Sequence, residues 1–582
     1  MAMTSKYTAN VGALPLQEYP RPQLARDSYY NLNGAWDYAI VPKGTALSGY
    51  QGSILVPFSP ETSLSGVEKT VTGNDALYYR KTFDVPLSFF KDITLLHFTA
   101  VDYECEVTLN GKPLGSHKGG FLPFTFDVTD VLTDGENVLE LKVQDPTDKS
   151  YIARGKQVSR PGNIWYTGQS GIWGTVWMES VSKGYVEDLL IVPDIDKEEV
   201  RVTVTSKAPH VNLEVLYGGK TVASAKGEPG FVTAIPLPDA KLWSPEQPNL
   251  YDLRISVINS NGLIADTVSS YFGMRKFGVG KDSSGISRLW LNNKPYFHNG
   301  VLDQGYYPDG LLTPPTDEAM QDDIRLLKDM GFTMVRKHIK IEPLRWYYYC
   351  DKMGILVWQD MVNGGTTYNP LMIAVLPFLN IMFKDNTATA YKLFGRADKA
   401  GRDEFEREAA ETVDLLKNVV SLAMWVPFNE GWGQFDSDRI SENIQKMDPT
   451  RTVDRTSGWH DQKSGDFVSK HIYFTPIWVP KDDRCYLLSE FGGFSRAVKG
   501  HRKNDNLPFG YRMYFTKGQL QRAYKKIYEK RIIANIPRGL SACVFTQLSD
   551  VEGEINGLIT YDRLIDKMDR DFVKSVNDRA KI

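Results

Sequence analysis

The sequence predicts a multidomain protein in which an N-terminal β jelly roll and an immunoglobulin-like β-sandwich precede a C-terminal (β/α)8 TIM barrel. A chain of 582 residues is too long for a single hydrophobic core. Short alternating strands dominate the first half, whereas strands and helices alternate after about residue 280. We therefore expect domains at residues 1–182, 183–278 and 279–582, with an inserted loop near 361–402.

The first domain contains strand-length segments that are separated by glycine, asparagine and proline. Residues 78–85 and 94–98 are rich in β-forming side chains, and residues 105–109 alternate between apolar and polar ones. The last of these segments runs into Asn110-Gly111, the strongest short signal for a β-hairpin. Few segments have helical periodicity, which favours a jelly roll or a sandwich.

The second domain also consists of alternating strands. Residues 200–204, 211–216 and 251–257 each place apolar side chains at every second position. The block has the length of one immunoglobulin-like domain, about 100 residues.

The third domain alternates between candidate strands and candidate helices. The strands are expected at 333–336, 355–358, 421–428, 451–455, 471–474, 485–488 and 543–545. The helices are expected at 317–330, 342–353, 402–418, 436–447 and 515–530. Repeated βα units predict a parallel sheet with covering helices. A doubly wound open sheet would carry a glycine-rich phosphate turn, which is absent, so a closed barrel is the better interpretation.

Composition and charge exclude several classes of protein. Hydrophobic residues make up 42% and charged residues 24% of the chain, which is typical of a globular protein. The net charge of −3 leaves no basic excess with which to neutralise nucleic-acid phosphates. The 4 cysteines are widely separated and form no CxxC pair, which excludes a disulfide scaffold and a cysteine zinc site.

The sequence gives no sign of a membrane segment. The N-terminal residues lack the apolar region of a secretory signal, and the apolar run 371–383 is shorter than the roughly 20 residues that span a bilayer. We expect a soluble, cytoplasmic protein without membrane or nucleic-acid partners, and leave a homo-oligomer open. The segment 361–402 does not fit the βα repeat, and such segments usually form lids or interfaces.

Two segments of the barrel deliver a glutamate to the end of an apolar strand. In the first, residues 425–433 read Trp-Val-Pro-Phe-Asn-Glu-Gly-Trp-Gly and place Glu430 where barrel enzymes hold catalytic groups. A lone glutamate is more often a solvated loop residue. Here, however, apolar neighbours are expected to raise the pKa of Glu430 towards that of a general acid.

The second segment, residues 485–493, repeats this arrangement and ends in Glu490 followed by two glycines. Glycines leave room for a ligand to approach the backbone. A pair of carboxyl groups on separate strands is the constellation that glycoside hydrolysis requires. We therefore interpret Glu430 and Glu490 as the catalytic pair of a glycosidase, which acts on a carbohydrate or glycoside.

These segments resemble glycoside hydrolase family 2, which includes β-galactosidases, β-glucuronidases and β-mannosidases. The resemblance covers nearly the whole chain and rests further on residues 20–27, 31–36, 119–124, 242–251 and 273–276. It implies that Glu430 is the general acid/base and Glu490 the nucleophile of a retaining reaction. Barrel strands alone are compatible with either the retaining or the inverting spacing.

The resemblance also implies substrate-binding residues. Asn429 is expected to bond the sugar 2-hydroxyl, and Arg336 to orient Glu490 and lower its pKa; a structural salt bridge is the alternative for Arg336. His338 is expected to touch the sugar, unless it is a packed or solvated histidine.

Three aromatic residues complete the predicted site. Tyr473 is expected to bond Glu490, and Trp459 and Phe545 to form a platform under the sugar. Aromatic residues on barrel strands are often only core, and Phe545 stands where the family usually has tryptophan.

Departures from the family pattern narrow the substrate. Residues 358–364 lack the Glu-x-His of magnesium-dependent β-galactosidases, so we expect no metal and no cofactor. Leu558 stands where β-glucuronidases carry the lysine that reads the sugar carboxylate, which disfavours a glucuronide. Residues 301–305 lack the family's usual histidine after the first strand, so the sugar pocket is atypical.

The favoured function is therefore a retaining exo-β-glycosidase that releases a terminal neutral sugar, with β-galactosides as first choice. The alternatives are a β-glucuronidase or other β-glycosidase of the family, a noncatalytic carbohydrate-binding protein, and a transglycosidase. We expect the insertion 361–402 to contact the aglycone or a second subunit.

Overall fold

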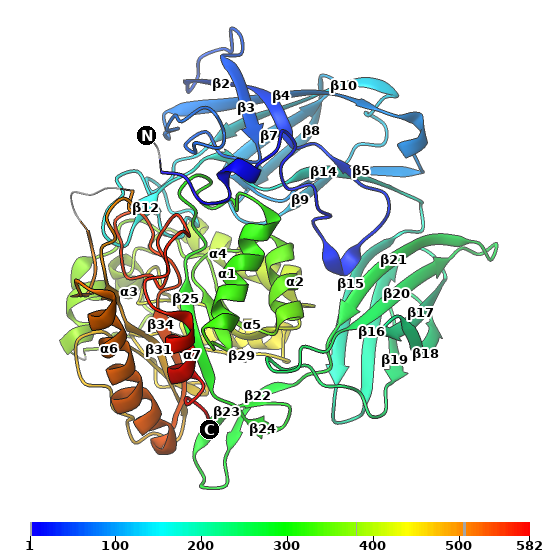
Figure 1. Cartoon of the computed structure of the whole chain (residues 1–582). Helices are drawn as coiled ribbons and strands as arrows, with labels where there is room; N and C mark the ends of the chain where they lie inside the picture. Colours follow the sequence, from blue (N-terminus) through cyan, green and yellow to red (C-terminus); the bar gives the residue numbers. More distant parts are fainter. Residues whose placement is uncertain (1–2, 380, 504–507) are drawn as a thin grey trace.

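The computed structural model describes residues 3–379, 381–503 and 508–582. The jelly roll lies at the top of Figure 1, the immunoglobulin-like domain at the right and the barrel below and to the left. The predicted fold class is confirmed, while residue 380 of the apolar run 371–383 lies outside the described residues. Within the described part, no helix is long and apolar enough to cross a membrane.

The jelly roll packs two main antiparallel sheets against each other. One sheet has the order β1 (Tyr30–Asn31), β14 (Val176–Val181), β5 (Ile93–Phe98), β9 (Phe124–Asp127). The other has the order β3 (Gly52–Val56), β2 (Gly34–Pro42), β4 (Asp75–Val85), β10 (Gly135–Gln144), β7 (Glu104–Leu109), β8 (Lys112–Lys118). Short pairs join β11 (Gln157–Val158) to β12 (Tyr166–Thr167) and β13 (Gly171–Ile172) to β6 (Val101–Asp102). Alternating inward side chains, such as Leu139, Leu141 and Val143 of β10, form the core between the sheets.

The second domain is a sandwich of a three-stranded and a four-stranded sheet. The first is β15 (Val186–Asp194), β16 (Glu199–Ser206), β19 (Val232–Pro236). The second is β18 (Lys220–Gly227), β17 (His210–Tyr217), β20 (Tyr251–Ile258), β21 (Ile264–Phe272). Its core again comes from the inward half of each alternating strand.

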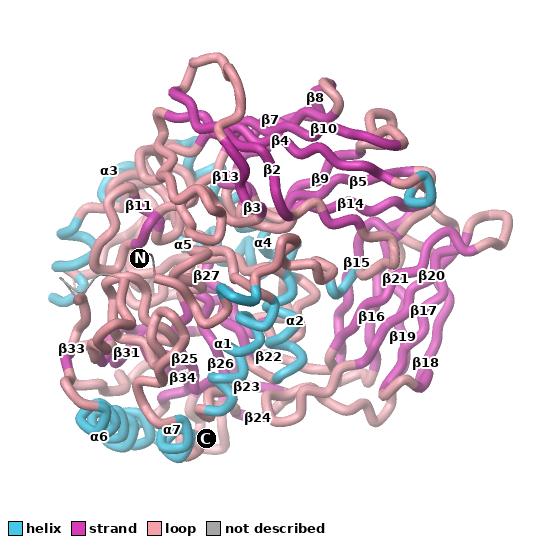
Figure 2. The backbone as a smooth tube through the Cα atoms, turned by 45° about the horizontal axis from the view of Figure 1, so that its top comes forward, coloured by secondary structure: helices cyan, strands magenta, loops and turns pink. Residues whose placement is uncertain are grey.

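The barrel consists of eight parallel strands, seen from a second direction in Figure 2. In chain order they are β25 (His298–Asp303), β26 (Met334–Lys337), β27 (Leu356–Asp360), β28 (Leu422–Val426), β29 (Thr452–Val453), β30 (Phe467–Ile472), β31 (Cys485–Gly492), β34 (Leu540–Thr546). A small sheet of β22 (Phe277–Lys281), β23 (Ser287–Leu291) and β24 (Lys294–Pro295) precedes them. Its Leu289 and Leu291 join the cluster of side chains inside the barrel, so this sheet packs against the barrel interior.

Helices cover the outside of the barrel. They are α1 (Asp317–Asp329), α2 (Leu344–Met353), α3 (Ala388–Leu393), α4 (Lys399–Leu416), α5 (Ser437–Met447), α6 (Lys517–Ile527) and α7 (Arg570–Asn577). Helix α1 begins where Thr316 caps it by accepting a hydrogen bond from the Ala319 N–H. Its apolar face, including Ile324 and Leu327, packs in the layer between strands and helices.

The segment 361–402 is less irregular than the sequence suggests. It contains two short helical turns, η4 (Leu371–Val375) and η5 (Pro377–Leu379), followed by α3 and the start of α4. Two of its side chains, Tyr368 and Ile373, pack beside Trp432 at the mouth of the barrel. The insertion is therefore a wall of the barrel mouth.

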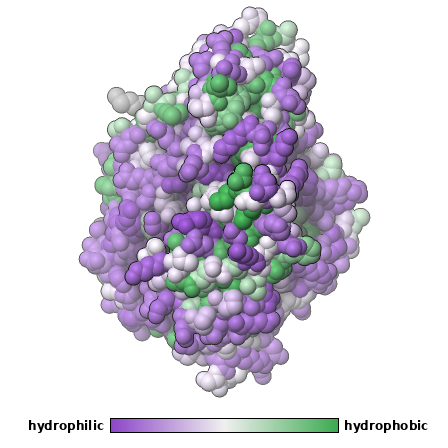
Figure 3. Space-filling model, turned by 90° about the vertical axis from the view of Figure 1, so that its right-hand side faces the viewer, coloured by the Kyte–Doolittle hydropathy of each residue, from purple (hydrophilic) through white to green (hydrophobic). Residues whose placement is uncertain are grey.

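The surface is mostly hydrophilic on the face shown in Figure 3, with hydrophobic groups gathered in a hollow near its centre.

A cavity of about 280 Å³ lies where the three domains meet, and its lining includes Trp177, Leu189 and Leu344. None of the predicted site residues lines this cavity.

Candidate active site

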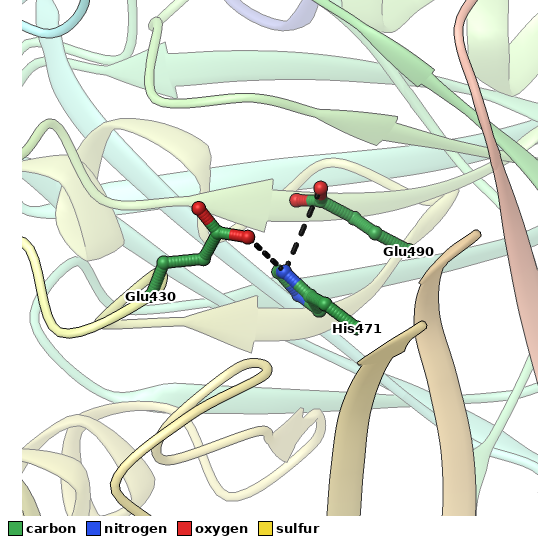
Figure 4. A group of neighbouring side chains, drawn as sticks. All are labelled: Glu430, His471 and Glu490. Atoms are coloured by element: carbon green, nitrogen blue, oxygen red, sulfur yellow. Dashed lines mark hydrogen bonds and ion pairs between the residues drawn. The ribbon is translucent and has the colours of Figure 1, made fainter. Parts of the chain in front are cut away.

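The two predicted glutamates converge at the carboxyl-terminal mouth of the barrel. Glu430 follows β28 and Glu490 lies in β31, three strands further along the chain. One carboxyl oxygen of each lies within 4.8 Å of the other and of a ring nitrogen of His471 (Figure 4). Retaining glycosidases hold their carboxyl groups about 5–5.5 Å apart, whereas inverting ones need about 6.5–9.5 Å. The spacing fits the retaining geometry.

Local backbone irregularities aim both side chains into the site. Glu430 has a positive φ of 51°, rare for a residue with a side chain, and its N–H donates to the Ser457 carbonyl at 3.0 Å. The pairing of β31 with β34 shifts between Leu488 and Phe491. Such a shift breaks the alternation of side chains, and it lets Glu490 point inward.

Arg336 of β26 is fully buried and connects the strands beneath the two glutamates. Its Nε and one terminal nitrogen donate to the two oxygens of Asp360 at 2.9 and 3.0 Å. The same guanidinium donates to Glu490 Oε1 at 3.3 Å and to Asn429 Oδ1 at 2.8 Å. This planar fork fixes a carboxylate and an amide at once, a role that lysine cannot reproduce.

In the described chain, the side-chain oxygen of Asn429 has a hydrogen-bond partner and its side-chain nitrogen has none. Its Oδ1 accepts from Arg336, which leaves Nδ2 as the outward donor. Within the described chain, this buried Nδ2 has no hydrogen-bond partner. A buried donor without a partner is costly, so the amide is prepared for a ligand oxygen.

Tyr473 holds the second oxygen of Glu490. Its hydroxyl donates to Glu490 Oε2 at 2.5 Å and lies 3.0 Å from Thr546 Oγ1 of β34. Its ring stacks on Tyr511 with centroids 4.0 Å apart. Burial raises the pKa of Tyr473 well above its usual value, so the phenol remains a donor.

The environment separates the protonation states of the two glutamates. Burial raises the pKa of Glu430 to about 7, against the opposing effect of the positive charges on Lys156 and Arg336. Burial also raises the pKa of Glu490, but this carboxylate accepts hydrogen bonds from both Arg336 and Tyr473. The donors on Glu490 favour its charged form, so the proton that the pair shares resides on Glu430 below about pH 7.

The jelly roll supplies a cation to the site. Lys156 is 6% exposed, and its Nζ lies 5.3 Å from the centroid of the Trp432 ring and 5.5 Å from that of Tyr166. Within the described residues, no carboxylate lies at ion-pair distance from it. A buried ammonium held only by ring faces raises the local positive potential near Glu430.

His338 is buried among the residues of the site. Its contact with a sugar stays a prediction. Its Nδ1 lies 2.7 Å from Asp360 Oδ2, so the ring donates there and leaves Nε2 as an acceptor. Burial lowers the pKa of His338 well below its usual value. It is therefore neutral.

The predicted aromatic platform needs correction. Trp459 is half-buried and its ring lies 6.4 Å from that of His471, which places it at the site. Phe545 is 1% exposed and packs with Phe491 and Tyr524 in the layer between strands and helices. The prediction of a platform role for Phe545 is wrong, because its position on β34 faces away from the barrel interior.

The sequence interpretation missed three residues of the site: His471, Asp360 and Lys156. His471 and Asp360 lie at strand ends, where their positions alone could have marked them. Lys156 carries no such signal, because it comes from another domain.

The atoms of Glu430, His471 and Glu490 are close enough together to hold a metal ion. However, the His471 Nε2 accepts from Arg336 at 3.3 Å, so the proton lies on Nδ1, the atom that faces the carboxyl groups. A protonated Nδ1 suits hydrogen bonding rather than metal ligation. The absence of a catalytic metal stays a prediction.

Comparison with known proteins identifies related domains. Family models described as "Glycosyl hydrolase 2 galactose-binding domain-like", "Glycosyl hydrolases family 2" and "Glycosyl hydrolases family 2, TIM barrel domain" match residues 57–172, 184–275 and 285–483. Together they cover most of the chain and all three domains.

Relatives carry more than one named specificity. A "Beta-galactosidase 2" of Enterobacter cloacae is 24% identical over 78% of this chain and 44% of its own length. A β-galactosidase of Vibrio vulnificus is 27% identical over 75% of this chain and 40% of its own. A "Putative beta-glucuronidase" of Formosa agariphila is 27% identical over 66% of this chain and 34% of its own length. This chain spans between 34% and 44% of the length of these and similar curated relatives.

Solved structures share the whole fold. A β-D-glucuronidase of Dictyoglomus thermophilum superposes with a TM-score of 0.73 at 20% identity, covering 96% of this chain and 98% of that one. A β-galacturonidase of Eisenbergiella tayi gives 0.68 at 18% identity, covering 97% and 98%. At these identities the likeness establishes the fold alone.

We predict that Arg336→Met destabilises the barrel by about 3–5 kcal/mol, because it leaves the buried Asp360 carboxylate without its cation. The exposed pair of Arg439 and Glu406 provides the matched control, and Arg439→Met should cost about 0–1 kcal/mol. Guanidinium denaturation of both variants measures the difference. Equal destabilisation would contradict the role given to Arg336.

Proposed function

Since this chain belongs to glycosyl hydrolase family 2, we propose that it is a retaining exo-β-glycosidase in which Glu430 is the acid/base and Glu490 the nucleophile. The observation that carries the proposal is the approach of the two carboxyl groups to within 4.8 Å, one of them held by Arg336 and Tyr473. This spacing supports retention, because it leaves no room for an attacking water between the groups.

In the first step, an oxygen of the Glu490 carboxylate attacks the anomeric carbon. The bond from that carbon to the aglycone oxygen breaks, and Glu430 gives its proton to the departing oxygen. The donors on Glu490 keep it ionised and in position, while burial keeps Glu430 protonated near pH 7. The unpaired Asn429 Nδ2 is the donor for the sugar 2-hydroxyl.

In the second step, water attacks the same carbon and the bond to Glu490 breaks. Glu430, now ionised, takes the proton from the water and returns to its starting state. The pocket must therefore stabilise a negative charge on Glu490 before the first step and on Glu430 before the second. Transfer to an acceptor sugar in place of water would make the protein a transglycosidase by the same chemistry.

We propose a neutral sugar, with β-galactosides as first choice. Leu558, at the position of the carboxylate-reading lysine, is fully buried in the barrel core. Relatives named as β-galactosidases support this choice.

A β-uronide is the second candidate, favoured by one observation. Lys156 brings a buried ammonium without a carboxylate partner among the described residues to the neighbourhood of Glu430. A sugar carboxylate would neutralise it. Hydrolysis of nitrophenyl β-galactoside and β-glucuronide by the wild type and by Lys156→Met separates the two: selective loss of the uronide activity identifies the second candidate.

We predict that Glu490→Gln lowers kcat with an aryl β-glycoside by at least about 10³-fold, because an amide cannot form the glycosyl-enzyme. Glu442→Gln, at an exposed position of α5, is the control and should leave kcat unchanged. Proton NMR of the wild-type reaction should show the β anomer released first. Undiminished activity in Glu490→Gln would refute the assignment. Saturable binding of a glycoside by the wild type without turnover would instead favour a noncatalytic binding protein.

The pH dependence of kcat/KM should report Glu430. Its pKa of about 7 predicts that activity falls as the pH rises through this value, because the general acid loses its proton. Lys156→Met removes a positive charge that lowers this pKa, so the alkaline limb should move to higher pH. A methyl glycoside is the suitable substrate, since a poor leaving group requires the acid. Lys526→Met on α6 is the control, and an unmoved limb in Lys156→Met would count against the proposed role of Lys156.

The insertion is proposed to contact the aglycone. Glu430 protonates the aglycone oxygen, so the groups beyond Glu430 line the aglycone side, and Ile373 packs there in the cluster of Trp432 and Tyr368. Ile373→Ser should raise KM for a naphthyl glycoside about tenfold, through lost apolar contact, and leave KM for the methyl glycoside of the same sugar unchanged. Equal effects on both substrates would discard this contact.

A further inference from the structure

We propose that the Nδ1–H of His471 stabilises the negative charge at both stages of the reaction from one fixed position, as the hydrogen-bond donor to Glu430 and as a nearby dipole for Glu490. His471 is then a positioning residue that faces both carboxyl groups. The inference rests on the proposed glycosidase function and assigns a role to a residue that the family resemblance did not mark.

The position of His471 between the two carboxyl groups is the first observation. Its Nδ1 lies 2.8 Å from Glu430 Oε1 and 3.6 Å from Glu490 Oε2, as the two dashed lines of Figure 4 show. The shorter contact is a hydrogen bond, and the longer one lies just outside that range. The donor therefore rests on Glu430, and the Glu490 carboxyl group lies close enough for an electrostatic contact.

The hydrogen bonds on the far side of the ring determine where its proton lies. Nε2 faces an Arg336 nitrogen at 3.3 Å and Ser457 Oγ at 3.1 Å. A guanidinium only donates, so Nε2 is the acceptor and the proton must lie on Nδ1. Burial lowers the pKa of His471 to about 4, so the ring remains a neutral donor at physiological pH.

The ring is held in place by close packing. The His471 side chain is 1% exposed, and a Cβ added to Gly458 would lie 2.7 Å from ring carbons. The glycine therefore allows the ring to sit directly against the backbone after β29. Because packing fixes the ring, its Nδ1 stays within reach of the two glutamates that it faces.

The charged and titratable groups around His471 come from several strands. They are Glu430 after β28, Glu490 of β31, Arg336 of β26, Asp360 of β27, Lys470 of its own strand β30 and, slightly further, His338 after β26. Arg336 and Asp360 are paired with each other, and His338 is bound to Asp360. The unpaired negative charge that changes place during catalysis is therefore the one shared by the two glutamates.

A neutral donor suits both stages of the reaction. Before the first step Glu490 is charged, and after it Glu490 is an ester while Glu430 has lost its proton to the leaving group. A hydrogen bond to an ionised group is about twice as strong as one to a neutral group, so the bond from Nδ1–H to Glu430 strengthens as the charge passes from Glu490 to Glu430. A fixed cation would instead favour one arrangement of charge throughout.

The test measures the two chemical steps separately in wild type, His471→Phe and His471→Asn. With 2,4-dinitrophenyl β-D-galactoside, the pre-steady-state burst gives the rate of glycosyl-enzyme formation, and the steady phase gives its hydrolysis. His471→Phe should slow both steps about 10- to 100-fold and move the acidic limb of each pH profile to higher pH, because Glu430 loses its hydrogen-bond donor and Glu490 loses the nearby N–H dipole. His471→Asn, which retains an N–H donor, should recover most of both rates. His210→Phe, at an exposed position of β17, is the control.

A second measurement does not depend on the folding of a variant. The downfield proton resonance of His471 Nδ1–H in the wild type should shift when a 2-deoxy-2-fluoro-β-galactoside traps the glycosyl-enzyme, since its partner Glu430 becomes charged. A single slowed step, unmoved pH limbs or an unshifted resonance would overturn the role of His471 while leaving the glycosidase proposal intact. A wild type that forms no glycosyl-enzyme with galactoside or glucuronide reagents would overturn both proposals.

Discussion

The buried guanidinium of Arg336 is the constraint on which the arrangement of the site depends. A permanent charge at zero exposure must be surrounded by acceptors, and the protein supplies them from four other strands or their ends: Asp360, Asn429, His471 and Glu490. Each acceptor is thereby fixed relative to the others. The proposed nucleophile, the proposed 2-hydroxyl donor and the neutral histidine are positioned by one planar group rather than by separate interactions.

The barrel and both glutamates could be predicted from the sequence because their signals are local. An apolar strand that ends in Asn-Glu or Ser-Glu shows its chemistry within a few residues, and βα alternation shows the sheet. Convergence of strands on Arg336 is not local, so Asp360 and His471 were missed. The predicted platform role of Phe545 was wrong for a different reason. Side chains alternate along β34, and Val544 faces the barrel interior while Phe545 faces the helices. A one-residue difference in register decides between a sugar platform and core, and the sequence alone did not fix that register.

The site also depends on more than the barrel. Lys156 reaches it from the jelly roll, and the insertion contributes Tyr368 and Ile373 to the wall beside Trp432. Trp165 of the jelly roll lies 5.0 Å from Trp432, ring to ring, and so closes the same wall. An isolated barrel would keep the two glutamates but lose the cation and the part of the apolar wall that Trp165 supplies. The N-terminal domain is thus part of the site.

The different roles of two chemically identical glutamates follow from the donors around them. Glu490 receives a charged donor from Arg336 and a phenol from Tyr473, whereas the single hydrogen bond on Glu430 Oε1 comes from a neutral imidazole. Two carboxylates this close repel each other strongly when both are ionised, so one of them keeps a proton. The proton remains on Glu430, where the hydrogen-bond donor is weaker. In the proposed reaction the sugar ester removes the charge from Glu490, and Glu430 then becomes the carboxylate that ionises. The asymmetry needed for the first step is therefore removed by that step itself, which prepares the pair for the second.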